Sequence, residues 1–135
     1  MTDRIDDTVE SDTIRQWTLR RIEIRTQIAR EAWPAVRLEL EHPDRGRVVD
    51  IAKAPGAFDA AFLAASQIVG VRPRLLSYNV RSSVPPPGES LPITIDVGIE
   101  LDGREFSGSS SGLDLVRCSV EAWLDAIAKA ARPFS

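Results

Sequence analysis

The strongest constraint on the fold is that the same series of strand and helix patterns occurs twice along the chain. Residues 36–41 alternate between apolar and charged side chains, and residues 92–101 alternate over a longer run. Alternation with a period of two is typical of antiparallel strands that have one buried face. In each half a strand pattern precedes this run, another follows it, and an amphipathic helical stripe comes last. The sequence therefore predicts an α+β protein with two βββα units packed together, at about residues 16–70 and 74–132.

Local signals set the boundaries in the first half. The apolar parity of its opening strand changes between Leu19 and Ile22, which indicates a β-bulge. The stretch H-P-D-R-G at residues 42–46 is typical of a turn between two strands. From Phe58 the apolar residues follow the spacing of one helix face. Gly70 is the expected end, because glycine adopts the left-handed conformation of a helix terminus most easily.

The second half carries the same kinds of signal. Three consecutive prolines at 85–87 exclude that loop from a central strand, since proline donates no backbone hydrogen bond. Asp102–Gly103 predicts a tight hairpin, the partner strand is expected at 104–108, and residues 109–112 are expected to cross over to the last helix. Asp114 is expected to cap that helix. Its predicted buried stripe consists of Val116, Val120, Trp123, Leu124 and Ile127.

Composition and charge argue against several classes of partner. The net charge of −3 gives no electrostatic reason to expect nucleic acid or an anionic membrane. No apolar run approaches the roughly 20 residues of a spanning helix, and the N-terminus lacks the pattern of a secretory signal. We therefore expect a cytoplasmic protein that binds neither nucleic acid nor membrane. Residues 1–13 are acidic and predicted to form a disordered tail, followed by one domain at 14–135.

The inventory of chemically active side chains is small. The single histidine, His42, is expected to be an exposed turn residue, and the single cysteine, Cys118, a small packed thiol in the last helix. One histidine and one cysteine cannot build the usual zinc sites, and the sequence has no phosphate-loop or dinucleotide fingerprint. The sequence therefore predicts no catalytic residue, no metal site and no cofactor.

Two segments rich in small residues lead into the helices, at 54–60 and 107–114. A helix start offers unpaired amide protons at the positive end of the helix dipole, and small residues let a ligand approach the backbone. Each segment is therefore either an ordinary joint or part of a site for a carboxylate. The serine-rich run at 107–112 also fits a flexible linker.

Three stretches together resemble one family. They are APGAFDAAF at 54–62, LLSYNVRS at 75–82 and FSGSSSGLDLVRCSVEAWLDAI at 106–127. In this order and spacing they are similar to the C-terminal regulatory domain of 2-isopropylmalate synthase and citramalate synthase. The resemblance runs from about Trp17 to Arg132, nearly the whole of the expected ordered chain.

The resemblance implies a pair of βββα units that form a homodimer. It also implies that leucine, or isoleucine in citramalate synthases, binds near the subunit interface. Where the family's loop has glycine, asparagine and proline, this chain has Ala54, Pro55 and Ala57. The residues that match the family's ligand site are Ala54, Pro55, Gly56, Ala57, Phe58, Asp59, Ala60, Leu75, Tyr78, Ser82, Gly112 and Asp114.

These observations leave three hypotheses open. The family's catalytic part is a (β/α)8 barrel that holds a divalent metal and needs on the order of 250 residues, so a chain of 135 residues is not expected to be a synthase by itself. We expect first a non-catalytic homodimeric module that senses a branched-chain amino acid and regulates a separate barrel subunit. One alternative is a ligand-free dimerisation scaffold, favoured by the substituted loop with its Pro55 and Phe58. The other is a small enzyme whose acid–base groups are Asp59, Tyr78, Arg81 and Asp114.

Overall fold

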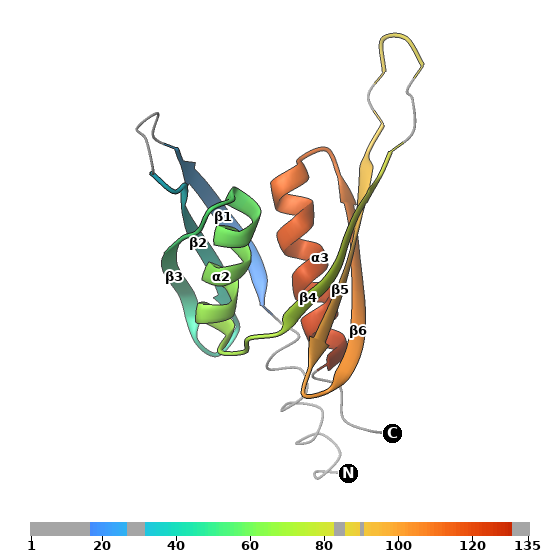
Figure 1. The fold of residues 1–135 in the computed structure, drawn as a ribbon. Coiled ribbons are helices and arrows are strands. Elements are labelled where there is room, and N and C mark those ends of the chain that lie inside the picture. The colour runs from blue at the N-terminus through green and yellow to red at the C-terminus, as the bar shows by residue number, and fades with distance from the viewer. Residues whose placement is uncertain (1–16, 27–31, 83–85, 90, 131–135) are drawn as a thin grey trace. The chain divides into compact units, whose positions relative to one another are not determined.

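The chain divides into two units of similar construction (Figure 1). We call residues 17–72 the first unit and residues 73–130 the second unit, and each is described by itself. The structure, a computed structural model, describes residues 17–26, 32–82, 86–89 and 91–130. The tail predicted at residues 1–13 lies outside these ranges.

Each unit consists of three strands followed by a helix, which confirms the predicted α+β class and the double βββα order. The first unit contains β1 (Thr18–Arg25), β2 (Ala35–His42), β3 (Gly46–Lys53) and α2 (Ala57–Val69). The second unit contains β4 (Arg74–Arg81), β5 (Ile93–Leu101), β6 (Arg104–Gly112) and α3 (Leu115–Ala130).

The core of the first unit lies between its sheet and its helix. Strands β1, β2 and β3 form an antiparallel sheet in that order, and α2 packs on β2 and β3. We call the side of the sheet that carries the helix the inner face, and the opposite side the outer face. The central strand has three inward side chains with no exposed surface, namely Val36, Leu38 and Leu40. Helix α2 buries a set of small side chains, which let a helix come close to a sheet: Ala60, Ala61, Ala64 and Ala65.

The predicted bulge is confirmed, and one occurs in each unit. The register between β1 and β2 shifts between Leu19 and Arg21, and the register between β4 and β5 shifts between Leu75 and Ser77. In the first unit the shift lets Leu19 and Ile22 face the same side of the sheet. The bulge therefore explains the change of apolar parity in the sequence.

The prediction of an exposed His42 is wrong. His42 is the last residue of β2, and only 1% of it is exposed, because alternation along the strand turns it inward after Leu40. Its ring centroid lies 5.0 Å from that of Trp17. Its Nδ1 accepts a hydrogen bond of 3.0 Å from the backbone N–H of Asp44. The turn that begins at Pro43 therefore satisfies a buried polar atom at the strand end.

The second unit repeats this construction with a different sheet. Strands β4, β5 and β6 are antiparallel in that order, and α3 packs on β5 and β6. The inner face of β5 buries Ile95, Val97 and Ile99. The predicted tight hairpin is confirmed, with φ of 54° at Asp102 and 80° at Gly103. Two consecutive positive φ angles are the signature of a type I′ turn.

The last strand is longer than predicted. β6 continues to Gly112, which pairs with Ile93 of β5, so residues 109–112 neither cross over to the helix nor form a linker. The composition misled the prediction, because glycine is depleted in strands and clusters of serine and glycine are typical of loops. In β6 every second residue from Ser107 faces outward, and three serines are exposed: Ser107, Ser109 and Ser111.

Helix α3 buries a different stripe from the one predicted. A Cβ at Gly108 of β6 would lie 2.1 Å from the carbonyl oxygen of Ala122 and 2.4 Å from the backbone nitrogen of Ala126. The helix turns this small-residue side toward the strand, so both alanines are fully buried, while Val116 and Leu124 are only half-buried. The other three members of the predicted stripe are buried as expected: Val120, Trp123 and Ile127.

Both predictions for helix ends are confirmed. Gly70 ends α2 in the left-handed conformation, with φ of 87°, and its N–H donates to the carbonyl of Ser66 at 2.8 Å. Asp114 caps α3, because its Oδ1 accepts a hydrogen bond of 3.0 Å from the backbone N–H of Arg117. Cys118 is 1% exposed, as predicted for a packed thiol, and burial raises the pKa of that thiol.

Replacing Gly108 with alanine tests the close contact between β6 and α3. The added Cβ would meet helix backbone, so we expect the free energy of unfolding to fall by about 1–3 kcal/mol, the range for overpacked cores. Urea unfolding, monitored by circular dichroism, measures this change in the free energy of unfolding. Ser107→Ala, at an exposed position next to it, is the matched control and should change stability by less than about 0.5 kcal/mol. Equal stabilities for the two variants would contradict the contact.

Candidate ligand-binding site

The segment at 54–60 forms a short joint between β3 and α2 in the first unit. Ala54 follows the last residue of β3 and is buried, and its N–H donates a hydrogen bond of 3.4 Å to the carbonyl of Pro34. Pro55 is exposed, and Gly56 precedes the first residue of the helix. The backbone before the helix is therefore tied to the segment that leads into β2.

The entrance to α2 lacks a side-chain cap. Gly56 occupies the N-cap position in an extended conformation, with φ of −123° and ψ of 153°, and no side chain makes a capping hydrogen bond there. The carbonyl of Gly56 accepts the regular first helical bond, 3.0 Å from the N–H of Ala60. Helix α3 differs, because Asp114 supplies its own acceptor. An entrance with no side-chain acceptor is the better place for an external carboxylate.

Polar and apolar groups lie together at this entrance. A Cβ added at Gly56 would lie 3.4 Å from Oδ2 of Asp59, so that carboxylate sits beside the N-cap residue. Asp59 is exposed, Ala57 and Phe58 are half-buried, and Ala60 is fully buried. The positive end of a helix next to a carboxylate suits a molecule that carries both charges.

Tyr78 holds a structural position in the second unit. Its hydroxyl lies 2.6 Å from Oγ of Ser119 on α3. Since Ser119 donates its own proton to the carbonyl of Leu115 at 2.7 Å, Tyr78 is the donor in the first bond. The phenol thereby links β4 to the first turns of α3.

The remaining candidate residues of the second unit fall at two ends of one sheet. Ser82 is exposed and directly follows β4. Gly112 is the last residue of β6 and lies at the same end of the sheet, and Asp114 follows it by two residues. Leu75 lies near the opposite end, seven residues from Ser82, or about 23 Å at roughly 3.3 Å per strand residue. The structure therefore brings Ser82, Gly112 and Asp114 to one end of this unit and leaves Leu75 apart from them.

Three of the four acid–base groups of the enzyme hypothesis, all except Asp59, already have partners within the second unit. Arg81 donates two hydrogen bonds to the carboxylate of Asp96, at 2.6 and 3.2 Å. This pairing lowers the pKa of Asp96 and raises the pKa of Arg81. Tyr78 is bonded to Ser119, and Asp114 caps a helix.

Within the ranges that the structure describes, no group of histidine, cysteine and carboxylate side chains could hold a metal ion. Within the same ranges, no helix has the length and apolar character needed to cross a bilayer.

Comparison with known proteins decides the family. The model of the LeuA allosteric (dimerisation) domain family matches residues 1–131. This chain belongs to that family. The resemblance drawn from the sequence motifs is thereby confirmed.

Relatives of this LeuA-type domain include the 2-isopropylmalate synthases of Xanthomonas campestris pv. campestris (strain B100) and Stenotrophomonas maltophilia (strain K279a). Each is 34% identical over 91 residues, which make up 65% of this chain. The enzyme of Xanthomonas axonopodis pv. citri (strain 306) is 33% identical over the same length. The matched segment spans only 16% of the length of these synthases.

Sequence reasoning missed one feature of the LeuA-type domain. Because α3 packs on β5 and β6, the inner face of β4 is poorly covered within its own unit. Leu75, Tyr78 and Val80 face inward opposite buried residues of β5, yet Leu75 is 41% and Val80 47% exposed. We call these three residues the β4 strip. The sequence holds no local signal for the strip, because its exposure depends on which two strands the helix covers.

A double-mutant cycle tests the link between Tyr78 and Ser119. Tyr78→Phe removes the donor, and we expect the free energy of unfolding to fall by about 0.5–1.5 kcal/mol, the usual net value of one hydrogen bond. Ser119→Ala alone and in combination gives the coupling energy by urea unfolding. Asn79→Ala, at an exposed neighbouring position, is the control. A coupling energy near zero would show that the bond contributes nothing to stability.

Proposed function

We propose that this chain is a homodimeric, non-catalytic module that senses a branched-chain amino acid. Leucine is the first candidate effector and isoleucine the second, and the target is a separate 2-isopropylmalate synthase subunit. Membership of an allosteric dimerisation family and identity to a segment of several synthases support this proposal. They also support a role in leucine biosynthesis.

The observation that carries the proposal is the uncapped entrance of α2 with Asp59 beside it. An amino acid is a zwitterion, so its carboxylate accepts hydrogen bonds from first-turn amides while its ammonium group faces Asp59. The half-buried Ala57 and Phe58 offer the aliphatic side chain an apolar neighbour. In this proposal Ala54, Pro55 and Gly56 shape the loop.

The five candidates in the second unit enter the proposal with different weights. Ser82 and Gly112 lie at one end of the sheet and remain proposed ligand contacts. Asp114 and Tyr78 already make internal hydrogen bonds, so we propose that they support the site and do not bind the ligand. Leu75 belongs to the β4 strip, and we assign it to the dimer contact.

The dimer contact is proposed to cover the β4 strip. Leu75 and Val80 are large apolar side chains with more than a third of their surface exposed. They lie on one strand face, and such contiguous exposure marks an interface more often than scattered exposure does. A second copy of the chain is the partner that a dimerisation domain requires.

Isothermal titration with leucine, isoleucine and valine tests the ligand proposal. We expect saturable heat for at least one of them. Gly56→Asn places a side-chain acceptor at the α2 entrance, so it should weaken binding at least tenfold, about 1.4 kcal/mol, without loss of stability. Asp59→Asn should also weaken binding, whereas Asp44→Asn in a distant turn should not.

The outcome also separates the competing functions. No heat with any of the three amino acids would favour the ligand-free scaffold. Unchanged binding by Gly56→Asn would place the site elsewhere. Adding the module, with and without leucine, to a synthase that lacks its own regulatory segment tests action on a separate subunit.

Light scattering tests the dimer contact. The wild-type chain should have a mass of about 30 kDa, twice its 14.9 kDa. Val80→Lys puts a charge into the β4 strip and should shift the mass toward that of the monomer at micromolar concentration, because an unpaired buried charge is costly. Asn79→Lys adds the same charge on the opposite face of the same strand and should leave the dimer intact. A dimeric Val80→Lys variant would exclude the strip as the contact.

A further inference from the structure

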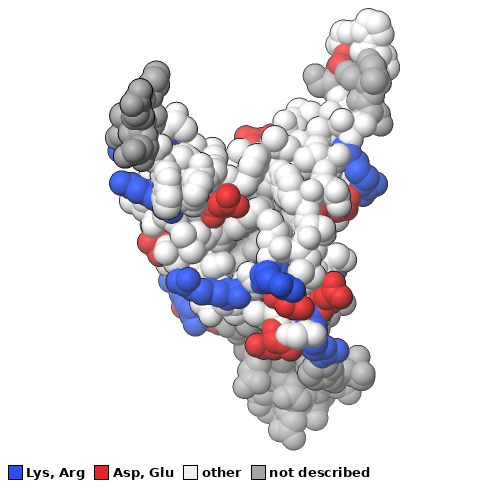
Figure 2. Space-filling view, viewed as in Figure 1, with Lys and Arg blue, Asp and Glu red and all other residues white. Residues whose placement is uncertain are grey.

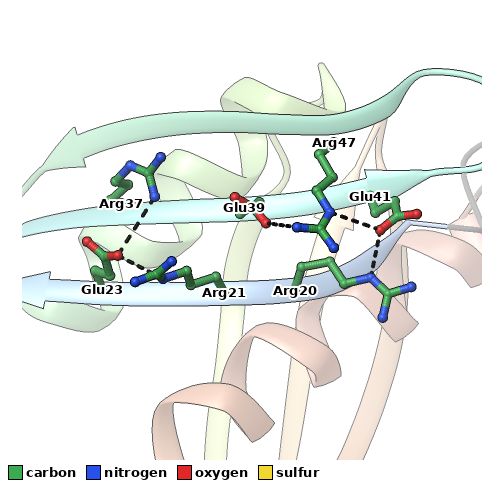
Figure 3. Close-up of polar contacts among 7 residues, drawn as sticks. All are labelled: Arg20, Arg21, Glu23, Arg37, Glu39, Glu41 and Arg47. Carbon is green, nitrogen blue, oxygen red and sulfur yellow. Dashed lines mark hydrogen bonds and ion pairs between the residues drawn. The ribbon is translucent and has the colours of Figure 1, made fainter.

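The outer face of the first sheet carries a ladder of charges (Figure 3). Strands β1, β2 and β3 all contribute, and cations and carboxylates alternate across the strands. The ion pairs of this ladder are Arg20–Glu41 at 2.8 Å, Arg21–Glu23 at 2.8 Å, Arg37–Glu23 at 3.8 Å, Arg47–Glu39 at 3.2 Å and Arg47–Glu41 at 3.4 Å. Most of the ladder is therefore neutralised internally.

One end of this face is hollowed and chemically different from the ladder. The hollow has a volume of about 710 Å³. It lies where β2 begins and where β1 and β3 end. Its principal lining residues are Glu23, Arg25, Trp33, Arg37, Ile51 and Lys53, with Ala35 at the centre.

The described residues that line the hollow carry a surplus of positive charge. Among them Glu23 is the only carboxylate, and that group already pairs with Arg21 and Arg37. Arg25 and Lys53 form no ion pair with any residue in the described ranges. On the face shown in Figure 2, the first unit at the left carries side chains of both signs, so the surplus is confined to the lining of the hollow. The whole chain has a net charge of −3, so this local excess runs against the overall balance.

Strand register explains why the hollow is open between Arg25 and Lys53, the two of its three described cations that are not in the charge ladder. Arg25, Ala35 and Lys53 are direct partners across the three strands. With neighbouring strands about 4.8 Å apart, the backbones of the two cationic residues stand roughly 10 Å apart. The side chain between them is a single methyl group. A carboxylate fits above it within reach of both cations.

An apolar wall adjoins this pair of cations. Trp33 is 56% exposed and Ile51 is 55% exposed. Both line the same hollow, and Ile51 is the cross-strand partner of Arg37. A ligand with a carboxylate at one end and an apolar body at the other could pair with the cations and pack against the apolar wall.

We propose that this hollow binds a small amphipathic organic anion. Its carboxylate lies over Ala35 between Arg25 and Lys53, and its apolar body packs against Trp33 and Ile51. The proposal is independent of the amino-acid site at the α2 entrance. A zwitterion gains little here, since its ammonium group would face surplus positive charge.

Hexanoate is the probe, because it joins one carboxylate to a short aliphatic body. In ¹H–¹⁵N spectra of the full chain we expect the indole N–H of Trp33 to shift saturably, with a Kd on the order of 1–10 mM. The buried indoles of Trp17 and Trp123 serve as internal references and should not move. Hexan-1-ol and hexylammonium, which lack the anion, should bind at least tenfold more weakly.

Three variants locate the contact. Ala35→Leu fills the floor without changing charge and should weaken hexanoate binding about tenfold. Lys53→Gln removes one cation and should weaken it about threefold. Arg47→Gln removes a cation from the same face outside the hollow and should leave Kd unchanged. Circular dichroism confirms that each variant is folded.

Several results would overturn the proposal. Equal binding of hexanol and hexanoate would mean that the cations take no part. Equal weakening by Arg47→Gln and Lys53→Gln would mean general electrostatic attraction instead of a site. If the wild-type chain is folded and the indole N–H of Trp33 does not shift at hexanoate concentrations up to about 50 mM, binding is excluded. None of these results depends on whether leucine binds at the α2 entrance.

Discussion

The close packing of one small-residue helix on two strands of a three-stranded sheet governs the architecture of each unit. In the second unit the contact is extreme, because Gly108 leaves no room for even a methyl group beneath Ala122 and Ala126. In the first unit α2 buries alanines above β2 and β3. A helix fixed over two strands leaves the inner face of the opening strand less covered, and it fixes where the chain must enter the helix.

The two helix entrances differ because their N-cap residues differ. Asp114 satisfies its own helix, whereas Gly56 has no side chain to offer. The same strand-to-helix geometry is thus closed in one unit and left open to an external acceptor in the other. Asp59 beside the open entrance adds a negative charge that a simple anion would avoid and a zwitterion would use. This asymmetry is the reason for proposing one sensing site in each chain and not two.

Much of the fold could be predicted from the sequence, because alternation and helical spacing record which faces are buried. The bulge near Arg20, the Gly70 stop and the Asp102–Gly103 hairpin each leave a local chemical signal. The longer β6 left none, because the contact of Gly108 with α3 depends on tertiary packing. The burial of His42 extends the alternation of β2 by one residue, but the turn-like stretch that begins there concealed it.

Only part of the candidate site could be predicted from the sequence. The α2 entrance could be inferred from small residues and from resemblance, but the role of Tyr78 depends on a partner 41 residues away. The uncovered β4 strip and the cationic hollow depend on register and on which strands the helix covers. Neither property follows from the spacing of residue types along the chain.

The central claim is that the α2 entrance binds an amino acid through its first-turn amides. Recording ¹H–¹⁵N spectra of the labelled chain during a leucine titration examines this directly. The account predicts saturable shifts concentrated at Ala57, Phe58, Asp59 and Ala60, with smaller changes across the sheets. Shifts confined to other segments, or none at saturating leucine, would contradict it.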